Sequence, residues 1–157
     1  MPIPRHFYGA RLHMNHASQK MRFLATSLVT HESKAGRYSQ IGSKPMLAVI
    51  AKLRTPVEGL MGASGFRALS SRAMALAGKD IPWWSDVRVG EDGLLDGLIE
   101  AERRVGAQKI ADGGITLLAC ILGLLVAFIG ESLTLRLVRE VWPRFPLNDY
   151  FTQGDIP

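Results

Sequence analysis

The sequence holds a single cysteine, Cys120, so one chain cannot form an internal disulfide bond. Cys120 stands in an apolar stretch, where we expect its thiol to pack as a small hydrophobic side chain. The basic start of the chain is not followed by the continuous apolar segment that a secretory signal peptide requires. Because nothing indicates an oxidising compartment, we expect a cytoplasmic protein.

The sequence also lacks the residue sets that common catalytic and metal sites require. All histidines lie in the first 31 residues, away from the cysteine, which leaves no Ser/His/Asp or Cys/His set (His6, His13, His16, His31). The spacing of His13 and His16 suits a metal, but no acid or cysteine accompanies them. The glycine-rich segment 59–65 lacks the sequence of a phosphate-binding loop or a nucleophile elbow. We therefore predict that the protein is not an enzyme and binds no cofactor and no metal.

Acidic residues are scarce in the N-terminal third. Residues 1–54 contain nine Lys and Arg residues and one acid, Glu32, whereas residues 55–157 contain ten basic and thirteen acidic residues. Such asymmetry marks some arms that bind nucleic acid or anionic membranes, and residues 1–54 are the candidate for either. The simpler interpretation, a solvated lead-in, is the one we favour. The acid-free residues 1–30 also share the composition of a mitochondrial presequence, and that alternative stays open.

The chain divides into a basic N-terminal extension, residues 1–43, and a helical domain, residues 44–157. We expect the extension to be irregular apart from a weak helix over 16–32, and the natural start is one of three methionines (Met1, Met14, Met21). In the domain, Ser43 and Pro45 predict the start of a helix. Pro56 predicts a break in it, with a new helix starting at a Thr55 to Glu58 capping box.

Further signals predict the middle of the domain. Gly62 and Gly65 predict a turn, and Ser64 is a candidate cap for a helix over 65–77. The alternation around Val87 to Val89, followed by Asp92-Gly93, predicts a small β-hairpin near 87–95. A helix over about 95–105 follows, with Leu98, Ile99 and Ala101 facing inward.

A long apolar helix, about 110–142, is the dominant feature. It contains 18 consecutive uncharged residues, 113–130, which would span about 27 Å as a helix. Equal numbers of basic residues on the two flanks give no positive-inside bias. We therefore predict a soluble, mainly α, compact helical bundle around this central helix. A kink in the helix is expected near Gly130. Insertion of 113–130 into a membrane and burial of this helix in an oligomer interface are the alternatives.

One stripe of small residues runs along this helix: Ala119, Gly123 and Ala127 recur at every fourth position. Small side chains let another helix approach closely, so the stripe is a candidate helix-packing interface. We expect the approaching helix to belong to the same domain, and Gly123→Leu then to destabilise it by about 1–3 kcal/mol through overpacking.

One anion or ion-pair site is suggested. Ser64 and Arg67 stand at a predicted helix start, where an anion can bind. Glu131 closes the apolar run, and a buried carboxylate there would need Arg67 or Arg72 as its partner. The alternatives are a simple turn at Ser64 and a purely structural ion pair at Glu131.

Residues 44–155 resemble a small all-helical domain of uncharacterised bacterial proteins. The resemblance rests on Gly65-Phe66-Arg67-Ala68-Leu69, on Pro82-Trp83-Trp84, and on residues 124–143, LLVAFIGESLTLRLVREVWP. It implies a soluble helical domain, and it implies no activity or ligand.

The expected function is therefore a non-catalytic helical protein-interaction or regulatory module, self-associating or docking a protein partner in a bacterial cytoplasm. The alternatives are a membrane-associated protein inserting residues 113–130, and a protein that binds nucleic acid through its basic arm.

Overall fold

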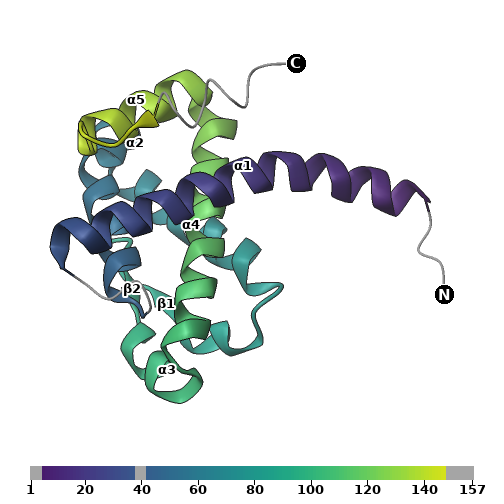
Figure 1. Cartoon of the computed structure of the whole chain (residues 1–157), viewed down its shortest axis with the longest axis vertical. Coiled ribbons are helices and arrows are strands. Elements are labelled where there is room, and N and C mark those ends of the chain that lie inside the picture. The colour runs from purple at the N-terminus through teal and green to yellow at the C-terminus, as the bar shows by residue number, and fades with distance from the viewer. Residues whose placement is uncertain (1–4, 38–41, 148–157) are drawn as a thin grey trace.

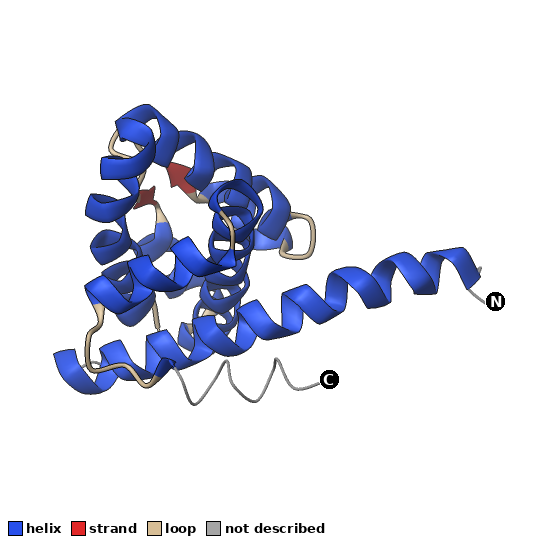
Figure 2. Ribbon diagram, turned by 90° about the horizontal axis from the view of Figure 1, so that it is seen from above, coloured by secondary structure: helices blue, strands red, loops and turns tan. Residues whose placement is uncertain are grey.

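The computed structural model describes residues 5–37 and 42–147, with side chains from residue 19 onward in those ranges. The described chain is mainly α, as predicted: four α-helices pack around a fifth, apolar one, and two short strands form an antiparallel pair (Figures 1 and 2). In chain order the elements are α1 (Arg5–Gly36), α2 (Lys44–Gly78), the 3-10 helix η1 (Pro82–Asp86), β1 (Arg88–Val89), β2 (Leu95–Asp96), α3 (Leu98–Val105), α4 (Ala107–Ile129) and α5 (Glu131–Val141).

Helix α4 is the apolar helix at the centre of the fold. It packs against α1, α2, α3 and α5, and its core side chains are almost inaccessible to solvent (Leu117, Leu118, Leu122, Leu125). The predicted helix 110–142 is not continuous, because Gly130 adopts φ 88° and ψ 160° and separates α4 from α5. A positive φ suits glycine, which has no Cβ to clash with the backbone. The kink expected at Gly130 is thus a full break.

Helix α1 differs most from expectation. Residues 5–15 were predicted to be irregular, and they are helical. The N-terminal half of α1 projects away from the body, while the second half crosses α4 (Figure 1). That second half buries Leu24, Ala25 and Leu28 in the same core as α2 and α4. The core therefore reaches across the predicted boundary at residue 44.

Helix α2 bends at a different residue from the one predicted. Pro56 lies inside the helix without breaking it, whereas Gly62 leaves helical geometry at φ 78° and ψ 169°. In place of the predicted capping box, Glu58 forms an ion pair with Arg54 at 2.9 Å. Ser43 is the N-cap residue but makes no side-chain capping hydrogen bond.

The predicted hairpin is confirmed, with Arg88 opposite Asp96 and Val89 opposite Leu95. Its turn contains Gly93 at φ 81°, where a Cβ atom would lie only 2.7 Å from the Phe66 ring. The helix predicted over about 95–105 starts later, because residues 95 and 96 belong to β2 and α3 begins at Leu98. In that helix Leu98 and Ala101 are buried as expected, whereas Ile99 is exposed and the prediction for it is wrong.

Candidate functional site

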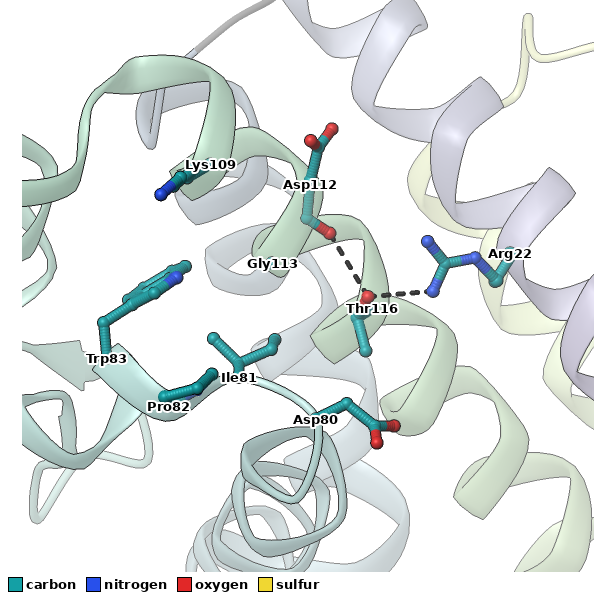
Figure 3. Close-up of a pocket in the computed structure, with 9 residues that line it drawn as sticks. All are labelled: Arg22, Asp80, Ile81, Pro82, Trp83, Lys109, Asp112, Gly113 and Thr116. Carbon is teal, nitrogen blue, oxygen red and sulfur yellow. Dashed lines mark hydrogen bonds between the residues drawn. The ribbon is translucent and has the colours of Figure 1, made fainter. Parts of the chain in front are cut away.

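A hollow of about 210 Å³ opens at the junction of α1, the turn before η1, and α4 (Figure 3). We call it the Trp83 hollow, and its lining residues are Arg22, Asp80, Ile81, Pro82, Trp83, Lys109, Asp112, Gly113 and Thr116. Arg22, Asp80 and Thr116 lie on one side in Figure 3, and Trp83 and Lys109 lie on the other. Segments far apart in the sequence thus meet around one small space.

The polar side of the hollow is held in place by hydrogen bonds. Arg22 donates from a terminal guanidinium nitrogen to the Thr116 hydroxyl oxygen at 2.8 Å, and this hydroxyl donates to the Asp112 carbonyl oxygen at 3.2 Å. The Asp112 carboxylate accepts a hydrogen bond from the Gln108 amide at 3.1 Å. The guanidinium is therefore anchored to α4 through Thr116.

The apolar side is held by close packing. A Cβ atom at Gly113 would lie 2.9 Å from the Trp83 ring, so the absence of a side chain there lets the indole lie against α4. The turn that carries Asp80 and Ile81 is fixed by backbone hydrogen bonds from their N–H groups to Ala77 and Gly78. The sequence singled out Trp83 only as part of the resemblance and did not predict the hollow, because its walls come from three distant segments.

The predicted ion-pair site is arranged differently. Ser64, Arg67 and Arg72 are all exposed on α2. Glu131 is half-buried and pairs with Lys20 of α1 at 3.1 Å, instead of with either arginine. The reason is that α1 crosses α4 and brings Lys20 to Glu131, which the sequence did not reveal. Anion binding at Ser64 and Arg67 stays a prediction.

The predicted interface on α4 faces outward over part of its length. Ala119 is buried at the edge of the core, but Ala127 is exposed, and a Cβ atom at Gly123 would meet nothing within 4 Å. The expectation that another helix of this domain packs on Gly123 is therefore wrong. The role of the stripe in contacts between molecules stays a prediction.

A wider apolar surface surrounds Gly123. It consists of half-buried and exposed residues that share one side of the helix, and we call it the open face of α4 (Cys120, Gly123, Leu124, Ala127, Phe128). Phe128 is 63% exposed. By length and composition alone α4 could cross a membrane, and 44% of its most apolar stretch is buried in the fold. Apolar surface on this helix is thus left over after folding.

Other chemistry-bearing groups give little sign of a reactive site. Burial raises the pKa of the half-buried Cys120 thiol; the charge of Arg22 lowers this pKa and that of Asp80 raises it further. A raised pKa leaves less of the reactive thiolate at neutral pH. No group of three metal-ligating side chains occurs among the described residues. His13 and His16 lie outside the residues whose side chains are described.

The described chain is a small all-helical domain, and to that extent it agrees with what the resemblance implied. Comparison of the chain with protein-family models, curated proteins and solved structures finds no match, so no family is identified.

Proposed function

We propose that this protein is a self-associating helical interaction module that pairs through the open face of α4. The observation that carries the proposal is that α4 is apolar along its length but buried on only part of its surface. Residues 113–130 contain no charge, yet Gly123 borders open space and Phe128 is largely exposed. Removing such apolar surface from water is favourable by about 25 cal/mol for each Å² buried.

A second copy of the chain suits this face. The small residues at Gly123 and Ala127 leave room for close approach of another helix, and an identical stripe offers the same room in return. Two-fold symmetric pairs are the commonest soluble oligomers, because one self-complementary patch is enough to form them. The face also carries no charge that an identical partner would repel.

A membrane surface is the second candidate, favoured by the length and apolar character of α4. The projecting half of α1 belongs to the basic N-terminal segment, which would attract anionic lipid headgroups. Nucleic-acid binding through residues 1–54 remains a weaker proposal, since it rests on charge alone.

Size-exclusion chromatography with light scattering of the full chain, without detergent, tests the proposal. We expect a dimer at twice the 17.2 kDa chain mass. Gly123→Leu fills the stripe and should convert the dimer to a monomer that remains folded, because a side chain at Gly123 meets nothing within its own molecule.

Gly59→Leu is the matched control. Gly59 also stands on a helix with open space beyond it, but it lies on α2. This variant should stay dimeric. A monomeric parent chain at all concentrations would refute self-association. Recovery of the chain only in the membrane fraction, released by detergent and not by salt, would establish the lipid alternative in its place.

A further inference from the structure

The Trp83 hollow presents opposite charges that do not pair with each other. Arg22 and Asp80 both line it, yet the salt bridges between described side chains do not join them. Arg22 donates its hydrogen bond to Thr116. The Asp80 carboxylate lies on the same side of the hollow as Arg22 and points away from the Trp83 ring (Figure 3). A guanidinium group and a carboxylate thus line one hollow without a salt bridge between them.

Arg22 and Asp80 are the opposite charges that decide which ligand suits the hollow. Lys109 and Asp112 also line it, but the Asp112 carboxylate points away from Arg22 and Asp80 (Figure 3) and accepts a hydrogen bond from Gln108. A simple anion attracted by Arg22 would meet repulsion from Asp80, and a simple cation would meet the reverse. A molecule carrying both charges satisfies both groups through charge-assisted hydrogen bonds.

The other side of the hollow is apolar. Ile81, Pro82 and the Trp83 ring provide a surface for an aliphatic or aromatic group, and the missing side chain at Gly113 lets that ring lie against α4. Small-molecule sites typically combine such an apolar wall with a few fixed polar groups. The fixed polar group here is Arg22, anchored through Thr116 to the backbone of α4.

We propose that the Trp83 hollow binds a free α-amino acid with an apolar side chain. Its carboxylate lies at Arg22 and Thr116, its ammonium group at Asp80, and its side chain against Ile81 and Trp83. This site shares no residue with the open face of α4, and the proposal does not rest on self-association.

Amide chemical shifts of the full chain, labelled with ¹⁵N, test the proposal during titration with L-phenylalanine. We expect saturable shifts at Gly113 and Thr116. Phenethylamine lacks the carboxylate and 3-phenylpropionate lacks the ammonium group, so each should bind about tenfold more weakly, which is the effect of losing about 1.4 kcal/mol of binding energy.

Two charge-removing variants separate the two ends of the ligand. Arg22→Gln should weaken L-phenylalanine binding about tenfold. It should leave phenethylamine binding unaffected, because phenethylamine has no carboxylate for Arg22 to bind. Asp80→Asn should weaken L-phenylalanine by a similar factor and leave 3-phenylpropionate unweakened. Arg139→Gln, an exposed arginine on α5, is the matched control and should change nothing.

Two results would overturn the proposal. One is the absence of saturable shifts at Gly113 and Thr116 with about 10 mM L-phenylalanine, which fills even a millimolar site. The other is equal affinity for L-phenylalanine and its two singly charged analogues. Thermal unfolding of each variant verifies that its fold is intact, and both substituted residues are exposed, so we expect no loss of folding.

Discussion

Glycines on α4 that look alike in sequence have opposite surroundings. Gly113 lies against the Trp83 ring, whereas Gly123 borders open space. We expect Gly113→Ala to destabilise the fold by about 1–3 kcal/mol, because the ring must shift to admit a methyl group. Gly123→Ala should instead be neutral or stabilise the monomer by up to about 1 kcal/mol through helix propensity. Urea denaturation of both variants, at a concentration where the parent is monomeric, measures the difference. Equal effects would contradict the assigned packing.

Glu32 is a buried carboxylate, 3% exposed, that joins three parts of the chain. It accepts a hydrogen bond from the Trp142 indole at 3.0 Å and pairs with the Lys52 ammonium at 2.6 Å. Burial raises the pKa of Glu32, but the hydrogen bonds from Lys52 and Trp142 and the charges of Lys52 and His31 outweigh it. The net pKa lies below the ordinary value of 4.5.

Because the folded-state pKa is lowered, the ionised form stabilises the fold above pH 4.5, and this contribution is lost as the pH falls through the folded pKa. We expect Glu32→Gln to lower the free energy of unfolding by about 1–3 kcal/mol at pH 7. Its deficit relative to the parent should shrink as the pH falls below 4.5. Chemical denaturation at a series of pH values from 7 to below 4.5 measures this deficit in the free energy of unfolding. Glu140→Gln, at an exposed position, is the control. A deficit independent of pH would show that the carboxylate charge contributes nothing.

At the scale of elements, the start of α2 is stabilised by another helix. The Glu102 carboxylate of α3 accepts a hydrogen bond from the Ser43 N–H at 2.8 Å, where the Ser43 side chain makes no cap. A negative group also interacts favourably with the positive end of the helix dipole. Glu102→Ala should therefore cost about 0.5–2 kcal/mol, the usual range for a lost N-terminal cap.

The matched control for this prediction is Glu100→Ala, because Glu100 is an exposed acid on the same helix. Thermal unfolding monitored by circular dichroism compares the two. If both variants unfold at the same temperature, the carboxylate of Glu102 does not cap α2.

The local signals for helix breaks had unequal success. Gly62 and Gly130 adopt positive φ and interrupt helices, as their residue type allows. Pro56 stays inside α2, although proline has no N–H to donate and clashes with the preceding turn. Packing of Leu53 and Val57 into the core on both sides of Pro56 holds this segment in register. A propensity that weakens one turn is outweighed by the burial of its neighbours.

At the scale of the whole molecule, α1 is part of the core. Leu24 and Leu28 are fully buried, and Glu32 is bonded to Trp142 from the other end of the chain. We therefore expect residues 44–157 alone to lose cooperative unfolding, because the surface that α1 covers would be exposed to water. Residues 19–157 should keep it. Thermal unfolding of the two fragments decides, and a cooperative transition for 44–157 would establish that segment as an independent domain.

The candidate sites could be predicted only in part. The small residues of α4 were identified from their spacing, but whether their partner lies inside or outside the molecule depends on where α1 and α2 pack. Glu131 was identified from its place at the end of the apolar run, and its partner Lys20 is 111 residues away. The Trp83 hollow could not be predicted, since neither Arg22 nor Asp80 carries a local pattern that brings them together.

The sequence by itself determined the helical class, the apolar central helix and the hairpin, because hydrophobic periodicity and turn residues act over a few neighbouring positions. Tertiary structure decided the place of α1, the partner of Glu131, the open side of α4 and the Trp83 hollow. These features depend on contacts between residues distant in the chain, whose energies come from burial and packing, and no local pattern in the sequence records them.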